Sequence, residues 1–196
     1  QFTQYPDGSA NSMAFFDNKL MIQGTFTNFY KIFDGSIEAT KHYLAGYNLS
    51  NYQLSPAVYE PNAYLNGMST DGSGNLVTGG TFTLMNYVDR QYLAAININT
   101  GLPTSWNPSP NSTVYSLAAK DTSIFVGGTF STIGTNALTR NFLAAVGKNS
   151  GKATTWAANC DNQVYSIAVK DTVLYVGGAF TTIKGSGRNY GAAVTT

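Results

Sequence analysis

The sequence repeats itself at a spacing of about 50 residues. The string DTSIFVGGTFSTI at residues 121–133 returns almost unchanged as DTVLYVGGAFTTI at residues 171–183, and looser copies lie at residues 74–82 and 18–26. Repeats of this period build solenoids, propellers or arrays, in which each unit packs against its neighbours. Four copies therefore predict a repeat protein rather than a chain folded around one central core.

The sequence pattern of each unit predicts four short strands. In the third copy, residues 114–119 alternate apolar and polar side chains, residues 124–126 form a second apolar run, and residues 142–146 and 154–156 form two more. Period-two alternation bounded by turn residues is typical of half-buried strands, and no apolar pattern of period 3.6 indicates a helix. Gly127 and Gly128 end the second strand, where glycine marks a bulge or a close backbone approach. The polar stretch at residues 131–141 is expected to be a loop.

A small sheet with two apolar faces must be covered on both sides, which neighbouring copies can do by stacking. The repeated small pairs and the repeated phenylalanines fit this packing: Ala94-Ala95, Ala144-Ala145 and Ala192-Ala193 would let sheets approach, and Phe82, Phe130 and Phe180 would fill the space between them. We therefore expect an all-β fold, a β-propeller of four-stranded antiparallel blades of about 50 residues. The single region 1–196 would divide into blades at residues 10–60, 61–109, 110–159 and 160–196 plus 1–9.

The phase of the repeat at the two ends bears on closure of the ring. The last unit stops at a third strand, and Phe2 stands as far before Ala10 as Trp156 stands before Val164. This arrangement is expected if the first strand completes the last blade, and equally if the chain is part of a longer propeller. Because four blades is the lower limit for propellers, we favour a piece of a larger protein or a subunit of an assembly.

The repeated motifs resemble those of a known family. The pattern Val-Gly-Gly-x-Phe, then Arg-x-aromatic-Leu-Ala-Ala, then Thr-Gly and Trp resembles kelch-type blades, and more closely the kelch-related propeller repeats of large secreted surface proteins. The first copy departs most, with Gln23-Gly24 for the glycine pair, a long loop at residues 27–40, and Ala57 or Tyr59 nearest to the place of the Trp. The resemblance implies an architecture and no activity, since propellers include enzymes, lectins and scaffolds.

Composition excludes several classes of partner. Charged residues make up 11% of the chain and the net charge is +1, with no cluster of either sign, so we expect no nucleic acid partner. No apolar run approaches the length of a transmembrane helix, so we expect no membrane insertion. Cys160 is the only cysteine, which rules out an intrachain disulfide.

Low charge and the sequons Asn48-Leu-Ser50 and Asn111-Ser-Thr113 favour an extracellular or cell-surface glycoprotein, with Asn48 and Asn111 as candidate glycosylation sites.

The catalytic residue types are scarce. His42 is the only histidine, and it stands at a position that is Gln91, Asn141 or Asn189 in the other copies, so we interpret it as an outward-facing strand residue. The same count argues against a zinc or copper site. We expect no catalytic residue, no metal and no cofactor.

Acidic residues leave two minor alternatives. Asp121 and Asp171 recur at one turn position and are interpreted as turn formers. Asp34, Glu38 and Asp89 lie in loops that could gather on one face, the arrangement a glycosidase would need, but no spacing demands it. Residues 71–75 have the alternating oxygen ligands of a calcium loop without its distal Glu, so a tight turn is preferred.

A recurring cation precedes each third strand. Lys41, Arg90, Arg140 and Arg188 could ring one face and bind an anionic or sugar ligand, or each could anchor its own blade by bonding loop carbonyls. The second interpretation is preferred. The long loop at residues 27–40 is the most aromatic, and exposed aromatic rings there would suit a sugar or a protein partner. The candidate partner face comprises Phe29, Tyr30, Phe33, Asp34, Glu38, Tyr87, Asp89, Arg90, Arg140 and Arg188.

These observations favour a non-enzymatic extracellular propeller that serves as a structural or interaction module in adhesion or assembly. Its partner would be a protein or a glycan, including copies of itself or further blades of a longer chain. The alternative is a carbohydrate-binding, lectin-like propeller. A glycan-cleaving enzyme is the third and least favoured hypothesis.

Overall fold

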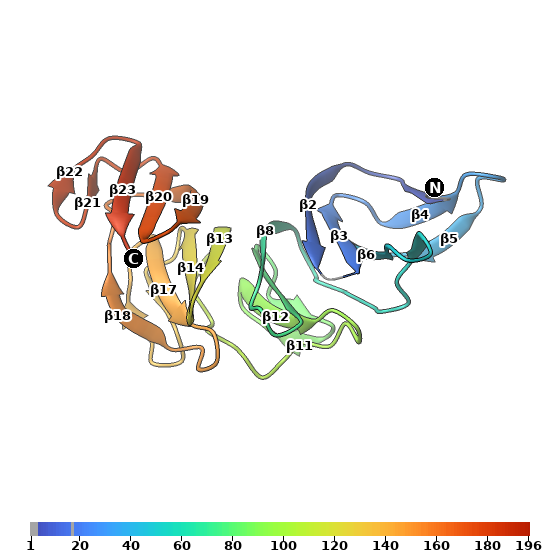
Figure 1. Ribbon diagram of the computed structural model, residues 1–196, viewed down its shortest axis with the longest axis horizontal. Coiled ribbons are helices and arrows are strands. Elements are labelled where there is room, and N and C mark those ends of the chain that lie inside the picture. The colour runs from blue at the N-terminus through green and yellow to red at the C-terminus, as the bar shows by residue number, and fades with distance from the viewer. Residues whose placement is uncertain (1–3, 17) are drawn as a thin grey trace.

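The computed structural model describes residues 4–16 and 18–196, and these residues form four antiparallel sheets that follow one another along an arc (Figure 1). We call these sheets blades 1 to 4. The first strands of neighbouring blades lie side by side, β2 with β8, β8 with β13 and β13 with β19.

Blade 1 consists of β2 (Ala10–Phe16), β3 (Lys19–Gly24), β6 (Leu44–Asn48) and β7 (Gln53–Leu54), and blade 2 of β8 (Leu65–Thr70), β9 (Asn75–Gly80) and β12 (Leu93–Asn97). Blade 3 consists of β13 (Val114–Lys120), β14 (Ser123–Gly128), β17 (Leu143–Gly147) and β18 (Ala153–Ala157), and blade 4 of β19 (Val164–Lys170), β20 (Val173–Gly178) and β23 (Gly191–Thr195).

The fold class predicted from the repeat is confirmed. Blades 1 and 3 have four strands in the order first, second, third, fourth, and in blade 2 the fourth strand is reduced to a bridge between Ile96 and Pro103. Blade 4 ends after its third strand, as the phase of the repeat predicted. Among residues 4–16 and 18–196 there is no helix of the length and apolar character needed to cross a membrane.

The segment between the second and third strands is a small hairpin in every blade, not the plain loop expected from its polar sequence. The hairpins are β4 (Asn28–Lys31) with β5 (Ile37–Thr40), β10 (Leu84–Met85) with β11 (Val88–Asp89), β15 (Thr132–Ile133) with β16 (Leu138–Thr139), and β21 (Thr182–Ile183) with β22 (Ser186–Gly187). Strands of two residues are too short to show an alternating pattern, which explains why the sequence did not reveal them. In blade 1 the hairpin is longer, and β1 (Gln4–Pro6) pairs with its β4.

Apolar cores lie between the blades, as stacking requires. The core between blades 3 and 4 contains Phe125 and Leu143 from one sheet with Leu174 and Val176 from the other. Equivalent clusters lie between blades 2 and 3 and between blades 1 and 2. The three repeated phenylalanines are fully buried, and Ala94, Ala95, Ala144 and Ala145 are buried against neighbouring sheets. Blades 2 and 3 are therefore stabilised mainly by the burial of both faces, and blades 1 and 4 by the burial of the face that meets a neighbour.

The glycine pair combines a bulge with a close approach. The first strand of each blade slips by one residue opposite this pair, for example between Val114 and Ser116 in blade 3. A Cβ atom on Gly128 would overlap the carbonyl oxygen of Thr113 within the same blade. A Cβ atom on Gly127 would lie 2.6 Å from Cγ1 of Val164 in blade 4. The second glycine thus permits the bulge, and the first receives a side chain from the next blade.

An aromatic residue before each third strand adopts a left-handed backbone conformation. The four residues have φ between 59° and 65°, and the carbonyl oxygen of each accepts a hydrogen bond from the second glycine of its blade, at 3.0 Å in Gly128 N to Phe142 O. Such φ values are strained for bulky side chains, so the surrounding hydrogen bonds must hold them. These residues are Tyr43, Tyr92, Phe142 and Tyr190.

The last segment of one blade is fastened to the third strand of the next blade, or to the residue after it, by an aromatic donor. Trp106 Nε1 donates to Gly147 O at 2.9 Å, and Trp156 Nε1 donates to Thr195 O at 2.8 Å. In blade 1, where the sequence has no Trp, the Tyr59 hydroxyl donates to Ile98 O at 2.6 Å. Tyr59 therefore takes the structural role of the missing Trp.

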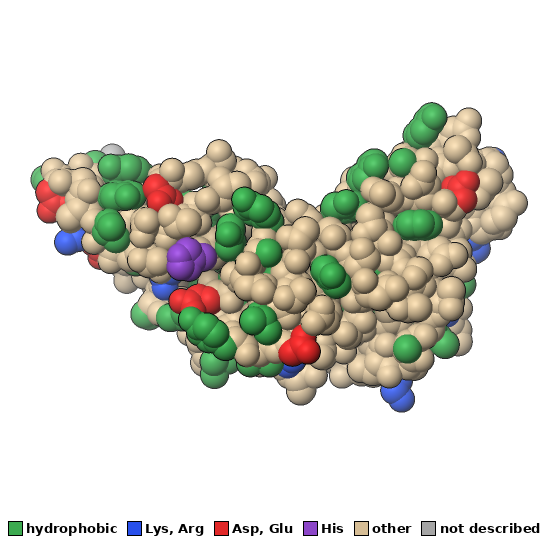
Figure 2. All heavy atoms as spheres, turned by 180° about the vertical axis from the view of Figure 1, so that it is seen from behind, with side chains coloured by type: hydrophobic (Ala, Val, Ile, Leu, Met, Phe, Trp, Pro, Cys, Tyr) green, Lys and Arg blue, Asp and Glu red, His purple; other side chains and the backbone are tan. Residues whose placement is uncertain are grey.

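Within the described residues, the N-terminal segment does not close the ring. β1 pairs with β4 of its own blade and not with β23, and the two ends of the arc lie apart (Figure 1). The reason is local. Pro6 pairs with Phe29 as Cys160 pairs with Ile183 in blade 4. Because β4 is longer than β21, its counterpart in blade 4, this pairing extends as far as Gln4. Phe2, on which the expectation rested, lies outside the described residues. The arc leaves a notch between its ends (Figure 2).

Candidate functional site

The recurring cations anchor their own blades. Arg140 donates from Nη1 to Thr139 O at 2.8 Å and from Nη2 to Thr154 O at 2.7 Å, and Arg90 makes the same two bonds to the carbonyl groups of Asp89 and Thr104. Lys41 is buried, and its Nζ donates to Ala57 O at 2.8 Å. These bonds tie each hairpin to the segment around the fourth strand. The preferred interpretation, in which each cation anchors its own blade by bonding loop carbonyls, accounts for these hydrogen bonds.

Arg188 differs because blade 4 ends after its third strand. Its guanidinium donates to Gly187 O at 2.8 Å, and among the described residues it has no fourth-strand carbonyl to bond. Its hairpin lies at one end of the arc, while β4 and β5 lie at the other (Figure 1). The ten candidate residues are therefore spread over four blades and do not form one site.

A second recurring polar residue, which the sequence reasoning missed, fixes the junction between blades. Asp161 Oδ1 accepts hydrogen bonds from the backbone N atoms of Thr181 and Thr182, at 2.8 and 2.9 Å. The equivalent residues Asp7, Asn62 and Asn111 make the same pair of bonds in blades 1 to 3. Each joins the segment entering a blade to the start of that blade's hairpin. These two segments therefore converge in every blade.

The Asp161 carboxylate should make stability depend on pH. Hydrogen bonds from the Thr181 hydroxyl and from the Thr182 amide lower the pKa of Asp161 from its ordinary 3.8 to about 2, although burial opposes the shift. A lowered pKa stabilises the folded state above pH 3.8, and this stabilisation is lost as the pH falls through about 2. Asp161→Asn keeps an accepting oxygen, as Asn62 and Asn111 do, but does not titrate.

We therefore expect Asp161→Asn to have a lower urea midpoint than the wild type at pH 7, because the neutral amide lacks the charge-assisted part of these bonds, and the difference to narrow as the pH falls. Below pH 4 the wild type should lose stability faster than Asp161→Asn, because its unfolded state takes up a proton that its folded state resists. Urea denaturation of both proteins between pH 7 and pH 2 measures the difference in their unfolding free energies. The contributions of the other acidic residues are the same in both proteins and cancel in this difference. Parallel curves over this range would contradict the assignment.

The two candidate glycosylation residues lie in different settings. Asn48 ends β6, half-buried between its partners Lys19 and Gln53. Asn111 is exposed, but its amide Nδ2 donates to Ser131 Oγ at 2.9 Å while its Oδ1 accepts two backbone bonds. Glycosylation at either residue stays a prediction.

Cys160 is buried between blades 3 and 4. Burial raises the pKa of its thiol to about 12, with a further contribution from the negative charge of Asp161. The thiol is therefore protonated at neutral pH and packs as a small apolar group.

The hairpin of blade 1 separates the aromatic candidates into core and surface. Phe29 is fully buried against Phe26 and Tyr47, so it belongs to the core and is removed from the candidate face. Tyr30 is half-buried, and its ring stacks on Tyr5 with centroids 5.7 Å apart. Phe33 is 97% exposed at the tip. The alternation along β4 places Phe29 and Tyr30 on opposite faces, which the loop assignment could not reveal.

The three candidate carboxylates are each bound within their own hairpin. Asp34 Oδ1 accepts from the Ser36 hydroxyl at 2.6 Å, and the bonds from Ser36 lower the pKa of Asp34. Glu38 Oε2 lies 3.5 Å from Lys31 Nζ. Asp89 belongs to blade 2, where it accepts a bond from Gln91. The structure gives each carboxylate a local partner, and it places Asp89 on a different blade from Asp34 and Glu38.

The predicted turn residues behave as turn formers. Asp121 and Asp171 have φ of 47° and 51° in the turns between first and second strands. Asp71 Oδ1 accepts from Ser73 N at 2.7 Å, and Oδ2 accepts from Asn75 Nδ2 at 2.7 Å. In residues 4–16 and 18–196, no three His, Cys, Asp or Glu side chains are grouped as metal ligands.

A shallow groove of about 170 Å³ lies where blades 1 and 2 meet. It is lined by His42 and Glu60 together with Tyr87, which is 86% exposed. A hydrogen bond with Glu60 raises the pKa of Tyr87, and the negative charge of Glu60 adds to this effect. Figure 2 shows the histidine on this surface with acidic and apolar side chains beside it. Polar groups next to an exposed ring are features of sugar-binding surfaces.

Comparison with known proteins identifies the fold. No protein-family model matches the chain, and no curated protein matches it. Among solved structures, the computationally designed Ika4 protein is similar with a TM-score of 0.60 and 11% identity, over 96% of this chain and 92% of Ika4. BamB from Moraxella catarrhalis is similar with a TM-score of 0.50 and 13% identity, over 87% of this chain and 44% of BamB. Both are β-propellers, and the chain has the β-propeller fold.

Proposed function

We propose that the chain is a non-enzymatic β-propeller interaction module of the cell surface or extracellular space, which binds a protein partner through the tip of the blade 1 hairpin. The observation that carries this proposal is the exposure of three large apolar side chains there. Ile32 is 58% exposed, Phe33 97% and Ile37 57%. Apolar side chains gathered at one exposed place mark an interaction surface, whereas isolated ones do not.

The construction of this hairpin supports the proposal. Its strands have four residues each, whereas the hairpin strands of blades 2, 3 and 4 have two. A tight turn at Gly35, with φ of 69°, joins β4 to β5. Hydrogen bonds from the backbone N and the hydroxyl of Ser36 to Asp34 Oδ1 fix the turn, and β1 pairs along β4 from Phe29 to Lys31. A hairpin that departs from an otherwise repeated unit is a suitable place for function. The low charge, the two sequons and the kelch-like pattern support the extracellular location.

A photo-crosslinking residue at the hairpin tip tests this function. We expect p-benzoylphenylalanine in place of Phe33 to give one discrete adduct in the secreted and surface fraction of the cells that make the protein. The matched control carries the same residue in place of Ser186, an exposed position on the hairpin of blade 4. Unlabelled wild type should compete for the adduct, and Phe33→Ser should not. Equal labelling from both positions would refute the proposed surface.

A lectin-like function is the second candidate, and the groove at Tyr87 favours it. An exposed ring beside Glu60 and His42 could stack on a sugar while the polar groups bond its hydroxyls. Selective binding on a glycan array that is lost in Tyr87→Ala, and kept in Phe33→Ser, would replace the protein partner by a carbohydrate.

A further inference from the structure

The contact between blades 2 and 3 and the contact between blades 3 and 4 follow one rule. We call the face of a blade that meets the next blade its forward face and the other its backward face. On the forward face of blade 2, a Cβ atom on Gly79 would overlap Val114 of blade 3 and lie 3.7 Å from Leu117 Cδ1. On the forward face of blade 3, Gly127 receives Val164 and Ile167 in the same way, at 2.6 and 3.4 Å. A bare glycine thus forms a socket for two apolar side chains from the backward face of the following blade.

A polar contact accompanies this socket between blades 3 and 4. The backbone N of Ile167 in blade 4 donates to the Ser116 hydroxyl in blade 3 at 3.0 Å. Ser166 stands in blade 4 where Ser116 stands in blade 3, opposite the first glycine of its pair. Blade 4 therefore has both parts of the contact, the glycine and the serine acceptor.

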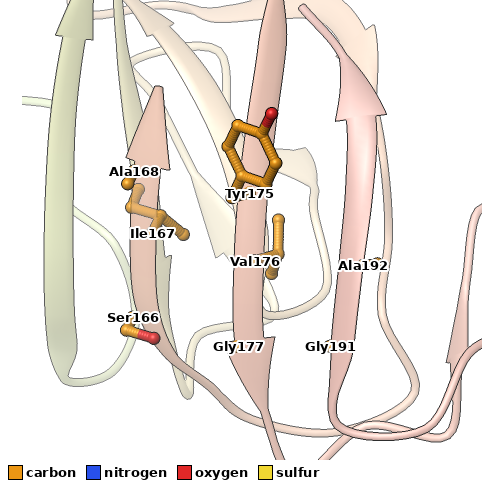
Figure 3. A pocket seen from close by; sticks show the side chains of 8 residues that line it. All are labelled: Ser166, Ile167, Ala168, Tyr175, Val176, Gly177, Gly191 and Ala192. Carbon is orange, nitrogen blue, oxygen red and sulfur yellow. The ribbon is translucent and has the colours of Figure 1, made fainter. Parts of the chain in front are cut away.

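The forward face of blade 4 has this socket but nothing covers it among the described residues. The atom nearest to a Cβ on Gly177 would be the Ser166 hydroxyl of the same blade. A hollow of about 490 Å³ opens here, lined by uncharged residues only, and Figure 3 shows the strands bare at Gly177 and Gly191 below the ring of Tyr175. Tyr175 is 50% exposed, whereas Phe125 at the same position of blade 3 is 4% exposed. Tyr190, the left-handed aromatic residue of this blade, is also exposed.

The backward face of blade 1 has the complementary part and is open near β2. Met13 occupies the position of Leu117 and Ile167, and it is 63% exposed where Leu117 is 8% exposed. Beside it lies an apolar hollow of about 280 Å³ that includes Leu20 and Ile22. The backward faces of blades 2, 3 and 4 are already buried within the chain.

We propose that the forward face of blade 4 binds the backward face of blade 1 of a second copy of this chain. Met13 of one copy would lie over Gly177 of the other, and Ser166 would accept a bond from the Met13 backbone N. Such a head-to-tail contact uses two different surfaces, so it forms a ring when the rotation closes. Two copies would give eight blades, which is within the range of known propellers. The contact residues Met13 and Gly177 are not part of the tip of the blade 1 hairpin, so the contact is tested independently of the proposed function.

The mass of the protein in solution tests the contact. We expect light scattering on a sizing column to give twice the 20.9 kDa mass of one chain. Gly191→Arg places a charge on the forward face at a position that is Leu143 in blade 3, and open space surrounds it. This variant and Met13→Asp should each halve the mass. Gly187→Arg, also in open space but on the hairpin β22, is the matched control and should leave the dimer intact.

Mixing the two variants separates this contact from any other. Gly191→Arg retains a competent backward face and Met13→Asp a competent forward face, so an equimolar mixture should recover a two-chain species through one remaining contact. A wild-type mass of one chain at all concentrations, or a dimer that neither variant disrupts, would overturn the proposal. Larger species abolished by both variants would support the contact and overturn the two-copy ring.

Discussion

Replacing Gly128 by valine should destabilise the fold by about 4 kcal/mol, at the upper end of what single substitutions do. The new Cβ atom would overlap the Thr113 carbonyl oxygen, which is backbone and cannot rotate away, and would lie 3.1 Å from the Val114 Cα and 3.2 Å from the Phe130 ring. The bulge opposite Val114 and the hydrogen bond from Gly128 N to Phe142 O both depend on this close approach. Urea denaturation followed by intrinsic fluorescence measures the loss.

Gly187→Val is the matched control for this prediction. Gly187 also ends a strand, but no atom lies within 4 Å of its added Cβ, so we expect its unfolding free energy to change by less than about 0.5 kcal/mol. Equal stability of Gly128→Val and Gly187→Val would show that the glycine pair has no role in the packing of the blade.

Replacing Arg140 by methionine should destabilise the protein by about 3 kcal/mol. Methionine keeps much of the apolar stem but removes the charge-assisted bonds to Thr139 O and Thr154 O, and each such bond contributes about 1.5–3 kcal/mol. The Nε atom of Arg140 is buried and its bond to Thr154 O is partly buried, whereas its bond to Thr139 O lies at the surface. Thermal and urea denaturation both measure the effect.

Arg188→Met provides the comparison within the same chain. Arg188 has the same place in the repeat but is exposed, and its bond to Gly187 O lies at the surface. We expect its substitution to change stability by less than about 0.5 kcal/mol. If the two variants were destabilised equally, the carbonyl bonds of Arg140 would not be the reason for its recurrence.

The sequence predicted the blade well where one residue type is required by geometry. Phe130 and Gly128 recur because no other side chain fits the same gap or the same bulge, so a period is enough to find them. Asp161 and Asn111 perform one task with two different residues, so a search for repeated letters missed them. Backbone conformation was also hidden, because the left-handed φ of Phe142 is held by its partners and not by its own preference.

The candidate site was less predictable for a physical reason. Phe33 and Phe29 lie in one aromatic loop of the sequence, yet only the pairing of β4 with β5 decides which ring is exposed and which is buried. The uncovered faces could not be predicted from the sequence, since Gly177 and Gly127 have nearly the same sequence context. They differ only in what lies next to them in space.

The aromatic links between blades have a consequence for how such chains evolve. Trp106, Trp156 and Tyr59 each reach only the adjacent unit, and the sockets at Gly79 and Gly127 likewise involve one neighbour. Gene duplication of blade 3, which has the socket on one face and the matching side chains Val114 and Leu117 on the other, would therefore reproduce a joint that the chain already contains. The number of units can change between generations without new packing having to be invented, which makes the size of the assembly, rather than its chemistry, the property most open to selection.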